Sequence, residues 1–151
     1  MGGLEFDATR ALEEVQVETL INYTARAVGL AESIVQETLN HVGLKKSGNI
    51  LLKDIPMVKR RLTTMNNKLT EEKKILQNLI FKKGDNLLKD AYRGKALVTE
   101  STVDIARIGL MLHGGLGYTK RYAVERHLRE AIGLTLIGTP TDIALSIVRT
   151  V

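Results

Sequence analysis

Apolar residues recur at helical spacing along most of the chain, and the clearest pattern lies between residues 55 and 79. Two apolar rows run through this stretch, formed by Ile55, Leu62, Leu69 and Leu76 and, three residues on, by Val58, Met65 and Leu79. Such a stripe is typical of a helix that packs against neighbouring helices. It is interrupted at Glu72. The stripe covers about three heptads, which favours an antiparallel bundle over a long coiled coil.

Residues that favour helix ends divide the first half of the chain. Asp7 or Thr9 is expected to cap a first helix that continues to about Val42, because short polar side chains accept hydrogen bonds from the free N–H groups of a first turn. The segment 43–49 contains two glycines and is expected to form a loop.

The second helix is expected to carry the apolar stripe. Asp54 is its expected cap, and Pro56 falls in its first turn, where the missing N–H costs nothing. Gly84, within the segment 81–86, is expected to end this helix.

The second half of the chain predicts further helices. One is expected over about residues 87–112, and its packed side is formed by Leu88, Ala91, Tyr92, Thr99, Thr102, Ala106 and Leu110. A glycine turn follows, then a shorter helix over about 124–135 and a last one from Thr141 or Asp142. No convincing period-two alternation occurs, so no strand is expected. We predict one all-α domain over residues 1–151, an antiparallel four-helix-bundle-like fold with a short extra C-terminal helix.

Composition narrows the class of protein. Apolar residues make up 44% of the 151 residues and aromatic residues 4%, so the core is expected to be aliphatic. The chain has no cysteine, which excludes disulfides and thiolate metal sites, and we predict no metal site. No apolar run approaches the ~20 residues of a membrane span, and the N-terminus lacks a signal-peptide pattern. A soluble, cytoplasmic protein is expected.

Charge is distributed unevenly along the chain. Residues 1–44 hold 2 basic and 7 acidic residues, residues 45–95 hold 14 and 5, and residues 96–151 hold 6 and 5. The basic middle could attract nucleic acid or another anionic surface. It lacks interleaved aromatic residues and any helix-turn-helix or finger motif, so nucleic acid is an unlikely partner and a solvated helix face is the favoured interpretation.

The sequence HGGLGY, residues 113–118, is the least ordinary stretch. Its glycines permit positive φ angles and let a backbone or a phosphate come close. It lacks the Gly-Lys-Ser/Thr ending of a P-loop and the preceding strand of a dinucleotide-binding fold. The residues alone therefore favour a helix C-cap followed by a turn.

The stretch around these glycines resembles the signature near the end of acyl-CoA dehydrogenases, where Gly-Gly-x-Gly-Tyr leads into Tyr-x-Val-Glu-Arg and Arg-Asp-Ala. The corresponding residues here are Gly114, Gly115, Gly117, Tyr118, Tyr122, Val124, Glu125, Arg126, Arg129, Glu130 and Ala131. Segments 28–42 and 54–65 are similar to the first two helices of that family's C-terminal bundle. The resemblance covers nearly all of this chain, and the family's N-terminal helical and middle β domains are expected to be absent.

The resemblance implies FAD-dependent α,β-dehydrogenation of acyl-CoA thioesters, as in fatty acid metabolism. In that family the flavin lies between the middle and C-terminal domains, a neighbouring subunit holds its adenosine end, and the bundles form the core of an oligomer. We therefore expect a homo-oligomer or a flavin-containing partner chain, with acyl-CoA as a possible ligand. The bundle alone is expected to be inactive.

Three alternatives remain open. The first is a non-catalytic oligomerisation or binding bundle that has lost its flavin. The second is a binder of anionic surfaces or nucleic acid through residues 45–95. The third is an expressed fragment or the product of a broken gene.

The resemblance offers no clear catalytic base. The family's base position falls on Gly138, which cannot take a proton, and Thr139 and Pro140 follow it. Relatives with the base on the first helix of the bundle place it near Glu18, but Glu18 misses that position by one residue, which is ~100° on a helix. Glu18 is the remaining candidate, although an ordinary exposed carboxylate is the favoured interpretation.

The resemblance also implies where the cofactor would be contacted. The expected cofactor-binding residues are Lys45, His113, Gly114, Gly115, Thr139 and Thr141. Met111 stands where the family has a glutamine, so a hydrogen-bonding side chain is lost there. Arg126 and Arg129 are expected to form ion pairs with nearby glutamates or with another subunit rather than to take part in catalysis.

Overall fold

The structure, a computed structural model, describes residues 8–82, 84 and 86–150. Within these residues the α-helices are α1 (Ala8–Leu44), α2 (Pro56–Phe81), α3 (Leu87–His113), α4 (Ala123–Leu136) and α5 (Thr141–Thr150). Two short 3-10 helices, η1 (Leu52–Asp54) and η2 (Gly115–Tyr118), join them.

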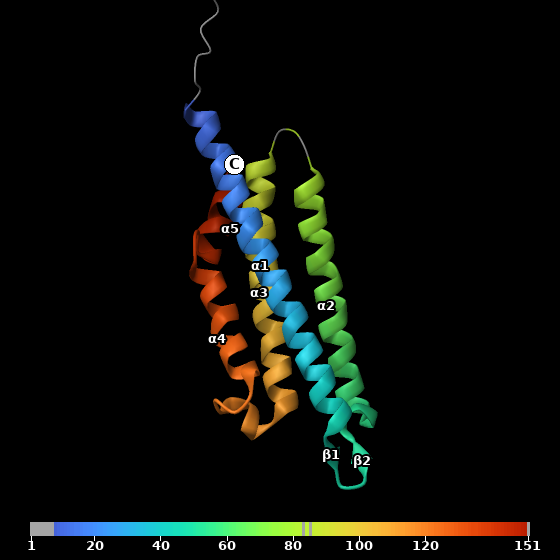
Figure 1. Ribbon diagram of the computed structural model, residues 1–151. Coiled ribbons are helices and arrows are strands. Elements are labelled where there is room, and N and C mark those ends of the chain that lie inside the picture. Colours follow the sequence, from blue (N-terminus) through green and yellow to red (C-terminus); the bar gives the residue numbers. More distant parts are fainter. Residues whose placement is uncertain (1–7, 83, 85, 151) are drawn as a thin grey trace, which may run out of the picture.

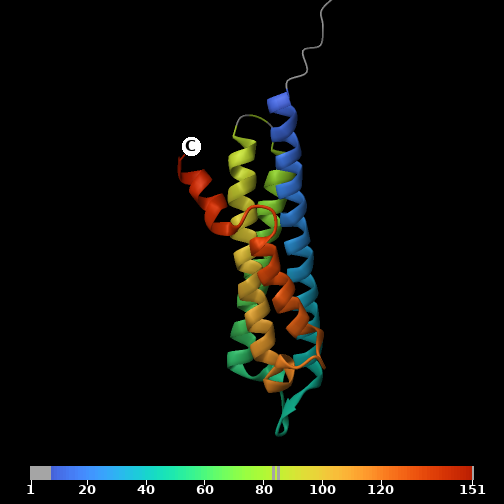
Figure 2. The ribbon, with the colours of Figure 1, turned by 90° about the vertical axis from the view of Figure 1, so that its left-hand side faces the viewer.

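The four longer helices lie side by side along one axis, and α5 turns away from them at the C-terminal end (Figures 1 and 2). The helix α3 is central, because it packs against α1, α2, α4 and α5. This arrangement confirms the predicted all-α bundle with an extra C-terminal helix.

Helix boundaries follow the predictions closely, with three differences. Helix α2 ends at Phe81 with Lys82 as its C-cap, so Gly84 does not end it. Asp54 does not cap α2, because it closes η1 and the apolar Ile55 occupies the N-cap position. The carboxylate of Asp54 lies 3.8 Å from Nζ of Lys59 instead. Thr9 lies inside the first turn of α1, and Asp7, the other expected cap, lies outside the described residues.

The expectation that the chain has no strand is wrong at one place. Strands β1 (Lys46–Ser47) and β2 (Ile50–Leu51) form a two-stranded antiparallel hairpin in and just after the predicted loop. Each strand has two residues, which is too short for an alternating pattern to be visible in the sequence. The hairpin extends from the end of the bundle where α1 ends (Figure 1).

The core is aliphatic, as the composition predicts. Its largest cluster joins α1, α2, α3 and α4 and includes Ala27, Ile34, Met65 and Ile105, all fully buried. On α3 the predicted packed side is buried at five of its seven positions, while Leu88 and Leu110 are half-buried. Buried threonines donate to carbonyl oxygens one turn earlier, as in the 2.8 Å bond from Thr24 Oγ1 to Leu20 O.

The C-terminal stretch Ala123–Arg149 is long and apolar enough to cross a membrane by length and composition alone, because an 18-residue window within it has a mean hydropathy of 1.6. The expectation that no apolar run approaches the length of a membrane span is wrong for this stretch. In the structure it is divided into α4 and α5 by residues 137–140, and α5 leaves the direction of α4 (Figure 2). Residues 123–149 therefore do not form one continuous helix.

Candidate cofactor site at the glycine turn

The glycine turn begins where α3 ends. Gly114 adopts φ 67° and ψ −161°, a conformation that favours glycine, and its N–H donates to Met111 O at 3.2 Å. The predicted helix C-cap and turn are therefore present. At Gly114 and Gly115, no described atom beyond the chain neighbours lies within 4 Å of the place where a Cβ would stand. The backbone of this turn is open to a ligand or another chain.

His113 ties the turn to the helix. Its Nδ1 lies 2.8 Å from Gly109 O, and a carbonyl can only accept, so Nδ1 carries the proton. The ring is 6% exposed, and Nε2 has no hydrogen-bond partner among the described residues. Nε2 is thus an acceptor that remains available inside the turn.

A second histidine, which the sequence did not single out, stacks on the first. The rings of His41 and His113 have centroids 4.0 Å apart and planes inclined by 30°. Tyr122 meets both rings edge-on, with centroids at 5.3 Å. Burial, with smaller effects from His113 and Lys45, lowers the pKa of His41. The lowered pKa of His41 favours its neutral form, and the three rings form an aromatic support beneath the turn.

Lys45 comes from the other side of this end of the bundle. Its N–H donates to His41 O at 3.0 Å as α1 ends, and its side chain is exposed. The structure thus brings Lys45, His113, Gly114 and Gly115 to the same end of the molecule.

The remaining expected contacts lie at the turn between α4 and α5. Gly138 adopts φ 72°, and a Cβ there would be 2.8 Å from Cε2 of Tyr23. Thr141 is buried, and its Oγ1 lies 3.4 Å from Thr135 O. A glutamate at the base position would meet both backbone strain and this tyrosine ring.

A buried lysine holds this second turn. Lys95 of α3 is fully buried, and its Nζ donates to Thr139 O at 2.7 Å and to Thr135 O at 3.2 Å. Burial lowers the pKa of Lys95, and Glu100 opposes the effect. The two hydrogen bonds from Lys95 join the end of α4 to the residue after Gly138 and so fix this turn. No pattern in the sequence singles out this lysine.

These two turns are not one compact site. They lie at opposite ends of the 14-residue helix α4, which is about 21 Å long at 1.5 Å per residue. In Figure 2 the glycine turn is at the end of the bundle and the α4–α5 turn is part-way along it. A ligand that meets both must be extended, or the two turns must serve different copies of a ligand.

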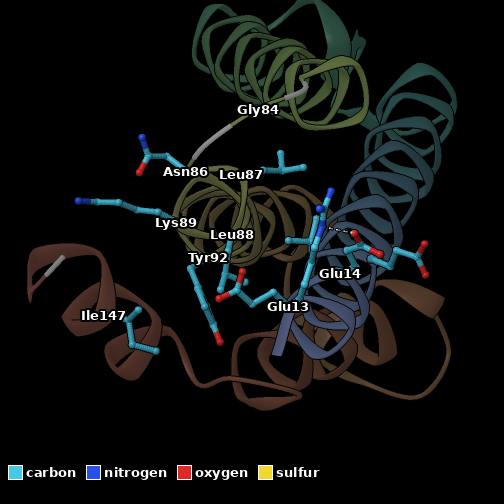
Figure 3. A pocket seen from close by; sticks show the side chains of 12 residues that line it. Glu13, Glu14, Gly84, Asn86, Leu87, Leu88, Lys89, Tyr92 and Ile147 are labelled. Atoms are coloured by element: carbon cyan, nitrogen blue, oxygen red, sulfur yellow. Dashed lines mark hydrogen bonds and ion pairs between the residues drawn. The ribbon is translucent and has the colours of Figure 1, made fainter. Parts of the chain in front are cut away.

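Glu18 lies away from the glycine turn. It is exposed on α1 and lines a cleft of about 960 Å³ between α1, the start of α3 and α5. Figure 3 shows Glu13 and Glu14 of α1, Tyr92 of α3 and Ile147 of α5 around this cleft. Glu14 is engaged by Arg10 at 3.3 Å. The structure does not bring Glu18 together with any of the expected cofactor contacts.

Some of the charged side chains of the described chain form ion pairs. The basic segment 45–95 forms ion pairs through Lys59, Lys68, Lys73 and Lys82. On α4, Arg126 pairs with Glu130 at 3.7 Å and Arg129 with Glu125 at 2.7 Å, as expected. Among the described residues no group of three or more His, Asp or Glu side chains is placed to hold a metal ion.

Comparison with known proteins supports the resemblance. A family model described as the C-terminal domain of acyl-CoA dehydrogenase matches residues 11–151. The chain belongs to the acyl-CoA dehydrogenase family.

Two bacterial proteins align with most of this chain. The 3-(aryl)acrylate reductase of Clostridium sporogenes is 30% identical over 112 residues, which cover 73% of this chain and 30% of the reductase. Subunit CarC of the caffeyl-CoA reductase-Etf complex of Acetobacterium woodii is 23% identical over 138 residues, which cover 90% of this chain and 36% of CarC.

Solved structures show the same fold. Butyryl-CoA dehydrogenase from Megasphaera elsdenii superposes with a TM-score of 0.87 at 18% identity, covering 98% of this chain and 39% of that enzyme. PigA with FAD and proline superposes with a TM-score of 0.83 at 19% identity, covering 89% of this chain and 36% of PigA. The chain thus spans between 30% and 39% of the length of these relatives.

The glycine turn fits one end of a cofactor such as FAD. Open space at Gly114 and Gly115 allows a ligand to approach the backbone closely, although the Gly114 N–H is already bonded to Met111 O, and Lys45 supplies a positive charge at the same end. Met111 is 58% exposed, and its thioether cannot make the hydrogen bonds that a glutamine at this position could make. The residues of this turn therefore fit part of the group, and the rest of a flavin site has to come from elsewhere.

Proposed function

We propose that this chain acts as the C-terminal domain of an FAD-dependent acyl-CoA dehydrogenase, in an assembly whose other parts supply the β-domain and the catalytic base. The observation that carries this proposal is the family match over residues 11–151 together with a glycine turn whose backbone is open. Gly138 at the base position argues that the α-proton is removed by another chain or segment.

In this assembly FAD would accept a hydride from the β-carbon of the acyl-CoA. The chain's own part is to hold the cofactor. The open backbone at Gly114 and Gly115, with the Gly115 N–H as donor, and the ammonium of Lys45 would contact its phosphate or adenosine end. His113 would keep the turn fixed through its bond to Gly109 O. Residues Thr139 and Thr141 would contact a cofactor at the second turn, held in place by Lys95.

The assembly can be captured directly from the source cells. The tagged chain is purified under native conditions, and its companions are identified by mass spectrometry. We expect a chain that carries the β-domain of an acyl-CoA dehydrogenase, and a yellow eluate with a flavin spectrum. A purified chain that alone reduced an electron acceptor with acyl-CoA would contradict the need for a partner.

A second candidate is a non-catalytic bundle that has lost its flavin. Two residues favour it. A glutamate base at Gly138 would be strained and would meet Tyr23, and Met111 stands in place of a hydrogen-bonding side chain. This candidate predicts oligomers of the chain by light scattering and no bound flavin under any condition. Tightly held FAD in the purified assembly would remove it.

A third candidate, anion binding through residues 45–95, has less support because four of its lysines are engaged in ion pairs. It predicts that affinity for a nucleic acid falls steeply with salt concentration. A flat response to salt would contradict it.

A further inference from the structure

A glutamate lies in the interior of the bundle. Glu72 interrupts the apolar stripe of α2, and its side chain is fully buried against α1 and α3. Its Oε1 lies 3.4 Å from Oγ1 of Thr102 on α3, and that hydroxyl is also 3.4 Å from Ala27 O on α1. Glu72 is therefore at the place where three helices meet.

The hydrogen bonds around Glu72 suit a neutral carboxylic acid. The hydroxyl of Thr102 has one proton, and its nearest acceptor is Val98 O at 2.9 Å. A carboxylate at 3.4 Å would then receive no strong bond from this hydroxyl, whereas a protonated Glu72 can donate to its lone pair. Oε2 of Glu72 has no hydrogen-bond partner in the described part of the chain. Ser101 supplies one further hydroxyl, but a buried carboxylate that is met by hydroxyls alone, with no cation of its own, remains costly.

The nearby cations are held by other carboxylates. Lys68, one turn before Glu72 on α2, lies 3.0 Å from Asp104 of α3. Lys73, the next residue on α2, lies 2.7 Å from Glu32 of α1. From α3, Glu72 is also met by the hydroxyls of Ser101 and Thr102.

The electrostatic environment of Glu72 agrees with this geometry. Burial raises the pKa of Glu72 to about 7, and Ser101, Thr102 and Lys68 oppose it less strongly.

We propose that Glu72 is a proton-binding site in the core that locks α2 onto α1 and α3. The bundle closes around the neutral carboxylic acid and loosens around the carboxylate. This inference does not depend on flavin or acyl-CoA, so its test is independent of the proposed function.

The sign of the effect follows from linkage. The folded state binds the proton of Glu72 more tightly than the unfolded state, in which the pKa of this carboxyl is near 4.5. The stabilisation is therefore fully present below pH 4.5 and is lost as the pH rises through about 7. Across this window the contribution of Glu72 to the unfolding equilibrium constant should change on the order of 100-fold, with unfolding favoured at the higher pH.

The test compares urea unfolding of the wild-type chain, Glu72→Gln and Glu71→Gln at a series of pH values from 4.5 to 8. Glutamine keeps the neutral shape at every pH, so Glu72→Gln should lose the part of the pH dependence that belongs to Glu72. Glu71 is the exposed neighbour, and Glu71→Gln should keep the wild-type profile. Parallel profiles for wild type and Glu72→Gln would overturn the proposal.

A second measurement covers the case in which Glu72→Gln does not fold. The carboxyl carbon of Glu72 is followed by NMR in the wild-type chain as the pH is raised. A midpoint near 7, accompanied above that pH by a loss of amide protection in α2 around residues 69–75 after correction for the intrinsic pH dependence of exchange, would support the lock. A midpoint near the ordinary value of 4.5, or exchange in α2 that does not respond to its titration, would overturn it.

Discussion

A single buried lysine determines the α4–α5 turn. Lys95 is on α3, yet its two hydrogen bonds reach the carbonyls of Thr135 and Thr139. Hydrogen bonds from a charged donor are worth about 1.5–3 kcal/mol each. The backbone around Gly138 therefore depends on a residue from a different helix.

Replacing this lysine should loosen the turn locally. In Lys95→Met the two carbonyls lose their buried donor while the volume of the side chain is largely kept. Backbone amides between residues 135 and 144 should exchange with deuterium about 10-fold faster, as for the loss of roughly 1.4 kcal/mol of local stability.

The control is Arg93→Met, which removes an exposed cation from the same helix. It should leave exchange in residues 135–144 unchanged. Equal exchange in wild type and Lys95→Met would mean that the lysine does not hold the turn.

The sequence could predict the glycine turn at this scale but not the side chains that support it. Gly114 and Gly115 stand in a recognisable local pattern. His41 and Lys95 reach their partners across the fold, at His113 and at Thr139. Such contacts between residues distant in sequence leave no local pattern that one sequence can reveal.

At the scale of helices, the contact between α1 and α3 depends on a small residue. A Cβ added at Gly109 of α3 would lie 2.9 Å from Cγ2 of Ile34 and 3.0 Å from Oγ1 of Thr38. Both neighbours are fully buried on α1. Neither has room to move without disturbing the packing of the core.

Two glycine-to-alanine changes should therefore have opposite effects. Gly109→Ala should destabilise the chain by about 1–3 kcal/mol through overpacking. Gly29→Ala is its match on α1, where no described atom meets the added Cβ, and it should stabilise by about 0.5–1 kcal/mol because alanine favours helix. Urea unfolding of both variants checks this, and equal effects would contradict the close packing of α1 on α3.

The extents of the helices could be predicted because helical periodicity is a local property. Pro56 does lie at the start of α2, and α3 ends at the glycines. The hairpin of β1 and β2 was missed because two-residue strands are set by backbone pairing and carry no periodic signal. Asp54 was misjudged as a cap because η1 intervenes before α2.

At the scale of the whole molecule, the expected contacts are spread over separate places. Lys45 and the glycine turn share one end, Thr139 and Thr141 lie beyond α4, and Glu18 lies on α1 in a different cleft. The chain spans 30–39% of its relatives and, by itself, does not bring the expected contacts into one site. The sequence could predict the family but not this separation.

The most direct measurement is the FAD content of the assembly captured with the tagged chain, read from its visible spectrum. Wild type is compared with Gly115→Asp, which places a negative charge in the open space of the turn, and with Gly29→Asp, which places one in open space on α1. We predict that wild type and Gly29→Asp carry flavin, and that Gly115→Asp captures the same partner with at least 10-fold less flavin. A colourless wild-type assembly, or equal flavin in all three, would contradict a cofactor contact at the glycine turn.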